Sequence, residues 1–358
     1  MITIKEMAEI AGVSPTTVAN VLHGRTKKVS KDTLERVQDI IEKSNYVSNM
    51  GARLLGNYGS RIIAVILAYS RSDRSNVIQD PFAGSIIGAM EQEISKRGYF
   101  MMLYTNPNIE ECLHMALAWN IEGLILLGVD RKDYYTFRSR LDIPIVTIDT
   151  YFREKDTEFV NIGLQDYEGG YMMTEYLIRQ GHKKISFLSM DPVGEEMADE
   201  FIDDARFLGY RDALEKNHIR YDAKRRIVLD GNVYVREKQL TELANNNFGD
   251  STAMFFAADY LAIEGMNVFY DLGYQVPEDI SIVGFDNIQA SLQCRPKLTT
   301  VQQDIAEKGK CGVEQLMEMI KKDKNKCVNK RLPVQLVIRD TVKQMDGTEH
   351  KQKHETSK

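Results

Sequence analysis

Residues 12–22 read Gly12-Val13-Ser14-Pro15-Thr16-Thr17-Val18-Ala19-Asn20-Val21-Leu22 and predict a turn followed by a short helix. Ser14 suits an N-cap because its hydroxyl can accept from an otherwise unpaired helical N–H. Pro15 suits the first helical position, where the missing N–H costs no hydrogen bond. Upstream, Thr3 can cap a shorter apolar helix that ends at Gly12. Two short helices joined by a glycine turn predict a helix-turn-helix, whose second helix enters the major groove of DNA.

A third helix is predicted to begin at Ser30 and to complete this small unit. Its residues Leu34, Val37 and Ile41 fall at positions i, i+3 and i+7, so they share one face. That face can pack against the apolar residues of the second helix and form a three-helix core. The sequence therefore predicts an all-α headpiece over residues 1–45, followed by a glycine-containing hinge or linker over 46–60.

The totals describe an ordinary globular protein of two or three domains. The chain has 358 residues, of which 43% are hydrophobic and 27% charged. No apolar run approaches the 18 residues of a membrane helix, and Lys5, Glu6 and Glu9 lie where a signal peptide needs an apolar stretch. We therefore expect no membrane contact and a cytoplasmic location. The cysteines lack metal-site or disulfide spacing and are interpreted as reduced thiols; they are Cys112, Cys294, Cys311 and Cys327.

The net charge of −6 is unevenly distributed along the chain. Residues 1–57 hold eight Lys and Arg against six Asp and Glu, a balance of +2, which leaves −8 for the remainder. This asymmetry fits a small anion-facing domain attached to a larger acidic one.

From Arg61 onwards, short apolar stretches alternate with helical patterns. The predicted strands are Ile62–Leu67, Phe100–Tyr104, Gly123–Leu127, Ile143–Ile148, Lys184–Leu188, Arg226–Leu229, Ala253–Ala257 and Ile280–Phe285. The helical patterns lie near Gly84–Arg97, Ile109–Ala118, Tyr134–Leu141, Tyr167–Gln180, Asp204–Asn217, Arg236–Asn245, Tyr260–Leu272 and Ile305–Lys322. Near-continuous apolar strands separated by helices indicate parallel sheets covered on both faces. Eight strands fit one large sheet or two ordinary ones, and the second series that begins with the Tyr167 helix favours two.

An ordered series of motifs resembles the lactose-repressor (LacI/GalR) family from about residue 2 to residue 342. The matching residues are Thr3–Ala8, Ala11–Ser14, Thr17-Val18, Val21-Leu22, Val29-Ser30, Tyr46, Asn49, Ala52-Arg53, Leu55, Asp80-Pro81-Phe82, Glu168-Gly169-Gly170, Gly181-His182, Arg206, Gly209-Tyr210-Arg211, Asp259, Ile282–Asp286, Leu298–Val301 and Leu332-Pro333. The resemblance implies a homodimer with a helix-turn-helix headpiece and an α/β, periplasmic-binding-protein-like core of two doubly wound parallel-sheet subdomains. These subdomains would span 61–162 with 304–330 and 163–303 with 331–342, leaving a disordered tail at 343–358.

The same resemblance implies which residues bind DNA. The recognition-helix set and its flanking loop comprise Ser14, Pro15, Thr16, Thr17, Asn20 and Arg25. The hinge set comprises Asn49, Ala52 and Leu55, and the family's leucine at this place wedges into the minor groove. Many members carry Ser-Arg where this chain has Ala19-Asn20, so we expect a different operator sequence. Ser48 replaces a usual proline and Gly51 a usual valine or alanine, which raises the expected cost of folding the hinge helix.

The resemblance also implies a small-molecule effector between the two subdomains. Its expected contacts are Asp80, Phe82, Arg206, Asp259 and Asp286. For each of the three carboxylates, Asp80, Asp259 and Asp286, a helix N-cap is the competing interpretation, because Asp caps helices well. Relatives that bind sugars often carry an asparagine where this chain has Ala258, and an Asp-Asn pair where it has Gln165-Asp166. A carbohydrate is the expected effector on the family pattern, and a nucleobase is the alternative.

Two other classes of protein share parts of this pattern. A solute-binding protein of a transport system shares the core fold, but it predicts a signal peptide and no helix-turn-helix. An α/β enzyme predicts a nucleophile elbow, a phosphate-binding loop or a histidine-centred site, and none follows a predicted strand. The sequence therefore favours a non-enzymatic, dimeric DNA-binding repressor without a cofactor or metal, which clamps a near-palindromic operator under control of a small molecule.

Overall fold

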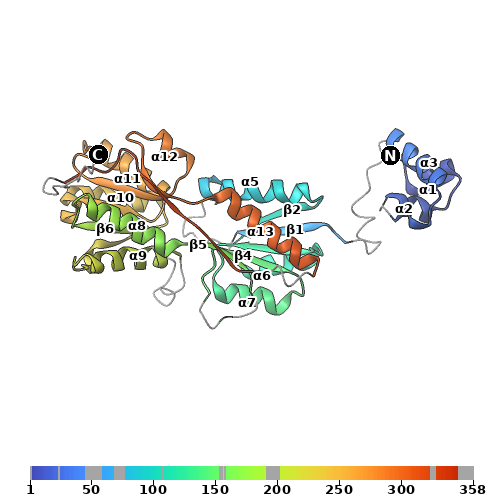
Figure 1. Cartoon of the computed structure of the whole chain (residues 1–358), viewed down its shortest axis with the longest axis horizontal. Coiled ribbons are helices and arrows are strands. Elements are labelled where there is room, and N and C mark those ends of the chain that lie inside the picture. The colour runs from blue at the N-terminus through green and yellow to red at the C-terminus, as the bar shows by residue number, and fades with distance from the viewer. Residues whose placement is uncertain are drawn as a thin grey trace, which may run out of the picture. The chain divides into compact units, whose positions relative to one another are not determined.

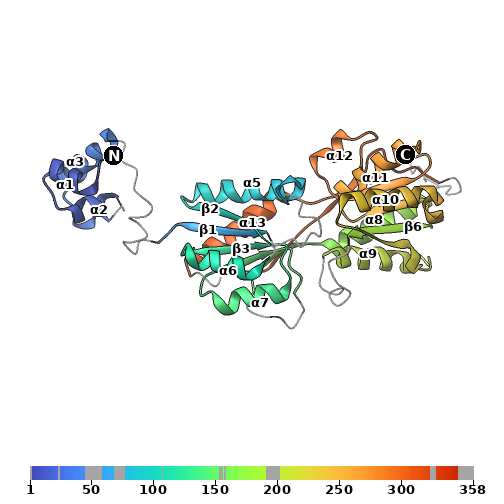
Figure 2. The ribbon, with the colours of Figure 1, turned by 180° about the vertical axis from the view of Figure 1, so that it is seen from behind.

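The computed structural model describes residues 2–22, 25–44, 59–67, 77–106, 108–152, 156, 159–190, 202–322 and 328–345. The chain separates into two compact units, Met1–Ser60 and Arg61–Lys358, called here the headpiece and the core. None of the described helices is both long enough and apolar enough to cross a membrane. Figures 1 and 2 show the elements of both units from opposite sides.

The headpiece contains three α-helices and one short 3-10 helix. They are α1 (Ile4–Ala11), α2 (Pro15–Leu22), η1 (Thr26–Lys28) and α3 (Lys31–Lys43). Thr3 and Glu6 form a reciprocal capping box at the start of α1, and Gly12 ends that helix with a φ of 63°. Ser14 accepts from the N–H of Thr17, and Ser30 accepts from the N–H of Thr33. The predicted starts of all three helices are confirmed.

The headpiece core consists of small apolar side chains contributed by all three helices. Its buried members are Met7, Ala8, Ala11, Val18, Val21 and Val37, with Leu22, Leu34 and Ile41 partly buried against them. The predicted packing of the third helix against the second is therefore confirmed. Because Val18 and Val21 point inward, the opposite face of α2 is directed to solvent.

The first half of the core is a six-stranded sheet, called sheet A. Its strand order is β11-β5-β4-β3-β1-β2, with every pairing parallel. Its strands are β1 (Ile62–Leu67), β2 (Phe100–Thr105), β3 (Gly123–Leu127), β4 (Ile145–Ile148), β5 (Asn161–Leu164) and β11 (Lys330–Leu332). The helical elements of this half are η2 (Val77–Gln79), α5 (Pro81–Lys96), α6 (Ile109–Ala118), α7 (Arg131–Arg140) and α13 (Ile305–Ile320).

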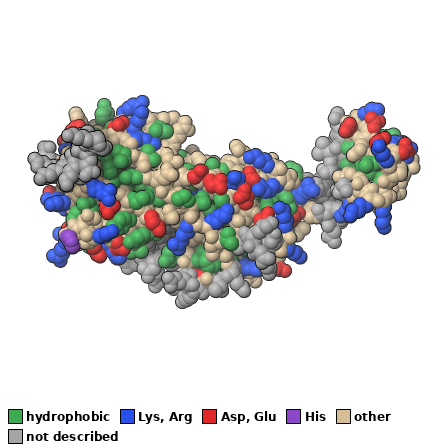
Figure 3. Space-filling view, in the orientation of Figure 1, with side chains coloured by type: hydrophobic (Ala, Val, Ile, Leu, Met, Phe, Trp, Pro, Cys, Tyr) green, Lys and Arg blue, Asp and Glu red, His purple; other side chains and the backbone are tan. Residues whose placement is uncertain are grey.

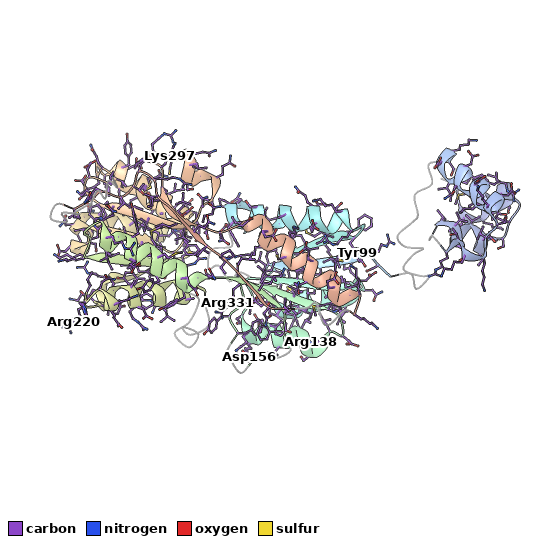
Figure 4. All side chains as sticks on the ribbon, in the orientation of Figure 1. Tyr99, Arg138, Asp156, Arg220, Lys297 and Arg331 are labelled. Carbon is purple, nitrogen blue, oxygen red and sulfur yellow. The ribbon has the colours of Figure 1, made fainter. Side chains whose placement is uncertain are left out.

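Sheet A is covered on both faces, as its continuous apolar strands predict. Along β1, Ile63, Val65 and Leu67 pack with residues of α5 and α13, whereas Ile62, Ala64 and Ile66 pack with residues of α6 and α7. Figure 1 shows α5 and α13 on one side of the sheet and α6 and α7 on the other. Figure 4 labels Arg138 on α7 and Asp156, whose carboxylate lies 3.2 Å from Arg131.

The second half of the core is another six-stranded sheet, sheet B, with the order β12-β10-β9-β8-β6-β7. Its strands are β6 (Ile185–Met190), β7 (Arg226–Leu229), β8 (Ala253–Phe256), β9 (Ser281–Asp286), β10 (Thr299–Gln302) and β12 (Gln335–Val337), of which β12 alone pairs antiparallel. Its helical elements are α8 (Asp166–Arg179), α9 (Ile202–Lys216), η4 (Ala223–Arg225), α10 (Val233–Asn245), η5 (Asn247–Asp250), α11 (Asp259–Asp271) and α12 (Gln289–Gln293). The prediction of two sheets is confirmed.

The chain passes between the two halves at three places. It leaves sheet A after β5, returns to it between β10 and α13, and leaves it again between β11 and β12. Arg331 on β11, labelled in Figure 4, marks this boundary. Beyond β12 the backbone stays bonded to the sheet B half: the N–H of Met345 donates to Gln180, and His182 contacts the carbonyl of Lys343. Two residues of the predicted tail, Lys343 and Met345, thus form hydrogen bonds with the sheet B half, and 346–358 lie outside the described residues.

Candidate functional site

The solvent-facing side of α2 carries the polar residues singled out from the sequence. Pro15 and Thr16 are exposed, whereas Thr17 and Asn20 are partly exposed. Ser14 is exposed too, and its hydroxyl is 2.9 Å from that of Thr17. A helix whose inner face is fixed by a small apolar core can present such side chains to base edges with little reorganisation.

Positive charge on the headpiece is concentrated after α2. Arg25, Lys27 and Lys28 are all exposed, and the two lysines lie in the η1 turn. On α3, by contrast, each cation lies one turn from a carboxylate; the pairs are Lys31 with Glu35, Arg36 with Asp32 and Lys43 with Asp39. Lys and Arg side chains project from the headpiece surface in Figure 3. The turn after α2 is therefore well placed to meet phosphates. The predicted hinge residues Asn49, Ala52 and Leu55 lie outside the described residues.

The core brings six polar residues together where its two halves meet, and we call this group the charge network. Its members are Asp149, Asp166, Arg206, Asp286, Gln303 and Lys308. Lys308, on α13, is fully buried, and its Nζ lies 2.9 and 2.7 Å from the two oxygens of Asp149. Asp149 directly follows β4 and has a φ of 57°. A buried lysine held by both oxygens of one carboxylate is a charge-assisted pair shielded from water.

Arg206 links the carboxylates of the sheet B half. Its Nε donates to Asp166 at 2.9 Å, its Nη2 lies 3.7 Å from Asp286, and its Nη1 donates to the carbonyl of Ala257. The guanidinium carbon lies 3.6 Å from the centre of the Phe285 ring. The arginine is thus fixed by two carboxylates, a carbonyl and an aromatic face, all of them buried.

Close helix packing positions this arginine. A Cβ built on Gly170 of α8 would lie 2.1 Å from the carbonyl oxygen of Arg206, and one on Gly209 of α9 would lie 2.1 Å from that of Tyr167. Each glycine therefore allows backbone-to-backbone contact between α8 and α9. That contact brings Arg206 beside Asp166, the first residue of α8. The two glycine motifs of the family resemblance thus have a direct role in building the network.

Gln303 completes the group from the segment that connects β10 to α13. Its Nε2 donates to Oδ1 of Asp286 at 2.5 Å, while its Oε1 is buried and has no hydrogen-bond partner among the described residues. Asp286 ends β9 with a φ of 113°. Backbone strain and an unpaired acceptor side by side are features typical of binding sites.

Burial dominates the ionisation of these carboxylates. It raises the pKa of Asp286 to about 7; Arg206, Gln303 and Lys308 oppose the rise, and Asp80 reinforces it. Burial also raises the pKa of Asp149, against the opposing charge of Lys308 and with a further increase from Asp166. These mutual influences extend from sheet A to sheet B, which identifies the network as one electrostatic unit.

Asp80 and Phe82 lie on the sheet A side of the network. Asp80 caps α5 by accepting from the N–H groups of Phe82 and Ala83 at 2.8 and 3.2 Å. Phe82 is partly buried, and the Nζ of Lys308 lies 5.2 Å from the centre of its ring. Both residues therefore adjoin the network, while the Asp80 carboxylate also serves as a helix cap.

Asp259 lies behind Asp286 rather than beside Arg206. It is fully buried; one oxygen accepts from the Thr300 hydroxyl at 2.5 Å, and the other from the N–H of Ile288 at 3.0 Å. Burial raises its pKa well above the usual range, and Asp286 reinforces the rise. A Cβ on Gly284 would lie 2.2 Å from this carboxylate, so glycine is required there. These bonds fix the loop that follows Asp286.

The sequence reasoning missed three members of the network, namely Asp149, Lys308 and Gln303, and it named Asp166 only as a departure from the family pattern. Two signals were available. Asp149 directly follows an apolar strand, as Asp286 does, and the carboxyl ends of parallel strands form sites. Lys308 lies one turn before Gly312 and two turns before Gln315 and Leu316 on the buried face of an amphipathic helix, where a lysine needs a partner. Among the described residues, no cluster of His, Cys, Asp or Glu is arranged to hold a metal ion.

Two protein-family models match separate parts of the chain. The model of bacterial regulatory proteins of the lacI family matches residues 3–49, which include the helix-turn-helix. The model of the periplasmic binding protein-like domain matches residues 174–342. The two matches fall on the two units of the structure and confirm the resemblance drawn from the motifs.

Relatives match almost end to end. The HTH-type transcriptional repressor PurR of Vibrio atlanticus is 31% identical over 97% of this chain and 100% of its own length. The ribose operon repressor of Haemophilus influenzae is 27% identical over 90% of this chain and 92% of its own length. A crystal structure of the Lac repressor dimer, bound to operator and the anti-inducer ONPF, aligns over 96% of this chain and 99% of that one, with a TM-score of 0.80 and 25% identity. The chain is therefore a transcriptional repressor, not an enzyme, and belongs to the lacI family of bacterial regulatory proteins.

Proposed function

We propose that this repressor binds a near-palindromic operator as a homodimer. We further propose that a small molecule bound at the charge network controls its affinity for the operator. The observation that carries the proposal is the pairing of two features in separate units. The headpiece presents the polar face of α2 over a fixed core, and the core holds a buried charge network that includes a carboxylate at positive φ, Asp286, and an amide oxygen of Gln303 with no hydrogen-bond partner among the described residues. Operator binding requires access to the chromosome, so the proposed location is the cytoplasm.

On the DNA side, Thr16 and Asn20 are the proposed base readers. The Asn amide is suited to adenine, and the Thr hydroxyl and methyl suit several bases, including thymine. Ser14, Pro15 and Thr17 lie at the N-terminal end of α2, where N–H groups favour phosphate contact. Arg25 would add a phosphate contact from the loop. The hinge residues Asn49, Ala52 and Leu55 are proposed, on the family resemblance, to fold on DNA and to open the minor groove.

The homodimer is supported by geometry and by a relative. A palindromic operator requires two headpieces related by a two-fold axis. The Lac repressor that this chain resembles was crystallised as a dimer on operator. Val233, Tyr234 and Val235, consecutive residues at the start of α10, are 40%, 74% and 44% exposed. They offer apolar surface to a second copy of the chain.

The effector site is proposed to comprise Arg206 and Asp286 with Asp80 and Phe82 at its edge, while Asp259 holds the loop behind it. The halves that would close around the ligand correspond to 61–162 with 304–330 and 163–303 with 331–342. A carbohydrate is the first proposal, since two of the relatives are the ribose operon and Lac repressors. A nucleobase is the second, because the partly buried ring of Phe82 beside the network could stack on a planar ligand.

A gel-shift assay on DNA upstream of the chain's own gene tests the DNA side. Asn20→Ala should weaken specific binding about tenfold or more, because a lost adenine contact costs about 1–3 kcal/mol. Gln38→Ala, an exposed polar change on α3, is the matched control and should leave the affinity unchanged. A full palindrome should bind far more tightly than a half-site. Equal affinity for specific and random DNA at every salt concentration would refute the proposal.

A further inference from the structure

A group of cations lies at the edge of sheet B where β6 and β7 begin, and we call it the distal basic surface. Residues 220–226 hold four Lys and Arg against one acid, Asp222, although the chain beyond residue 57 has a net charge of −8. Two further lysines directly precede β6, which is the parallel neighbour of β7. The members of the surface are Lys183, Lys184, Arg220, Lys224, Arg225 and Arg226.

The two parts of this surface adjoin at the loop before β8. Arg225 donates to the Ser251 hydroxyl at 2.7 Å, and the preceding residue, Asp250, binds the ammonium group of Lys184. β6 to β9 run parallel, and the charge network lies at their carboxyl ends, so the distal basic surface is at the opposite edge of the sheet. Figure 4 shows Arg220 at the end of the sheet B half that faces away from sheet A, and Figure 3 shows Lys and Arg side chains there.

The cations of this surface are poorly neutralised by their neighbours. Among the described residues, Lys183, Arg220 and Lys224 are exposed and form no ion pair with a carboxylate. Several exposed cations of the sheet A half are paired instead; these pairs are Lys96 with Glu93, Arg140 with Glu110, Lys310 with Glu307 and Lys321 with Glu318. A surface with charges of one sign attracts a partner of the opposite charge.

The headpiece has the same arrangement in the turn that is placed to meet phosphates. There the 3-10 turn η1 carries Lys27 and Lys28, and on the distal basic surface the 3-10 turn η4 carries Lys224 and Arg225. Each turn presents two adjacent cations on a short, rigid segment. Duplex DNA carries one negative charge about every 1.7 Å along its axis, so it is a polyanion that both turns can contact.

We propose that the distal basic surface binds the phosphate backbone of a second DNA duplex, without regard to its base sequence, while the headpiece holds the operator. Duplex DNA fits better than an acidic protein because a repressor on its operator is surrounded by DNA, and because phosphate binding requires only accessible cations. This function goes beyond operator recognition. It would let the repressor hold another segment of DNA close to its operator.

Fluorescence anisotropy with the full chain and a labelled duplex of random sequence tests the proposal. An excess of unlabelled operator duplex, taken from the gel-shift assay, first fills the headpieces and blocks their own non-specific binding. The labelled duplex should still bind. Its affinity should fall steeply between about 50 and about 200 mM salt, because counterions are released from each phosphate that the protein contacts.

Two double variants locate the contact. Arg220→Gln with Lys224→Gln removes two exposed cations of η4 and the loop before it. At about 0.9 counterions per contact, the loss of affinity across this salt range should be about tenfold smaller than in the wild type. Lys96→Gln with Lys321→Gln removes two exposed lysines that glutamates already neutralise, and this matched control should behave as the wild type. Neither pair should alter affinity for the operator.

The outcomes separate this surface from the function proposed for the headpiece. If the labelled duplex no longer binds once operator fills the headpieces, the proposal is wrong, and an acidic protein becomes the better partner for the surface. Equal salt dependence in the distal and control variants would also contradict it. If the gel shift finds no operator, the proposed operator binding fails; the random duplex is then titrated alone, and the two double variants still decide whether the distal basic surface binds it.

Discussion

Sheets A and B have the same strand order, and their equivalent strands end differently. In β11-β5-β4-β3-β1-β2 and β12-β10-β9-β8-β6-β7, β4 corresponds to β9. Asp149 follows the first and Asp286 ends the second, both buried and both at positive φ. Lys308 satisfies both oxygens of Asp149, whereas Asp286 receives an amide at 2.5 Å and a distant arginine at 3.7 Å. The comparison indicates a fully paired carboxylate in one half, Asp149 with Lys308, which we call the closed pair. In the other half Asp286 has fewer donors around it, and we call this place the open end.

The difference originates in two equivalent helices. α8 follows β5 and α13 follows β10, and each packs on the sheet that the chain has just entered. In its first turn α13 carries Lys308, a base that neutralises Asp149 directly. The first turn of α8 carries Asp166, an acid, so a third residue, Arg206, has to bridge two carboxylates. One bridging cation for two anions leaves the sheet B end less completely neutralised.

The largest effect should follow from opening the closed pair. Lys308→Met leaves Asp149 buried without its cation, and we expect a loss of about 3–5 kcal/mol in the free energy of unfolding of the core. Urea denaturation of the full chain measures it. Lys310→Met, two residues along α13 and exposed, is the matched control and should change stability little.

A double variant sharpens this result. Lys308→Met with Asp149→Asn removes both charges and should recover much of the lost stability, because no buried ion is left unpaired and Asn tolerates the positive φ at this position. If Lys308→Met alone is as stable as the wild type, Asp149 has another source of neutralisation, and the contrast between the two sheet ends fails.

Glycine variants should have a smaller effect on the free energy of unfolding. They compare the α8–α9 contact, which supports the sheet B end, with the contact of α13 and α5 on sheet A. Gly209→Ala would place a Cβ 2.1 Å from the Tyr167 carbonyl oxygen, so α8 and α9 must separate, and we expect a loss of about 2–4 kcal/mol. Gly309→Ala, on α13, meets the Ile86 carbonyl oxygen at 3.1 Å, and the better helix propensity of alanine largely offsets that contact. The measurement is Tm by calorimetry. If Gly209→Ala lowers Tm as little as Gly309→Ala does, α8 and α9 tolerate separation.

The same contrast explains what could be predicted from the sequence. The predicted strands are all present because their residues are long apolar runs, and Asp286 was found because it follows one of them. Four strands were missed, namely β5, β10, β11 and β12, since strands of three or four residues such as Lys330–Leu332 and Thr299–Gln302 are too short or too polar to show an apolar pattern of their own. Lys308 was missed because a helix pattern does not show which sheet the helix covers. Its partner Asp149 is 159 residues away in the sequence, and only the crossing of the chain brings the two together.

The smallest expected effect is a change in pH dependence at the open end. The folded pKa of Asp286 is about 7 and its unfolded pKa is the ordinary, lower one, so its contribution to stability is complete in acid and is lost as pH rises through 7. In the Asp286→Asn variant the asparagine cannot ionise, so this contribution to stability does not fall as pH rises. Between pH 5 and pH 8 its stability should therefore rise by about 2 kcal/mol relative to the wild type.

Urea denaturation at four pH values between 5 and 8 measures this difference, with Asp271→Asn, an exposed change at the end of α11, as the control. Asn retains an oxygen that can accept from Gln303, so the geometry of the open end is kept. Asp149→Asn, at the equivalent place in sheet A, should instead destabilise the core throughout this range, because it leaves Lys308 charged and unpaired. Parallel pH profiles for the two variants would mean that both sheet ends are neutralised alike, and the assignment of ligand binding to the sheet B end would lose its electrostatic basis.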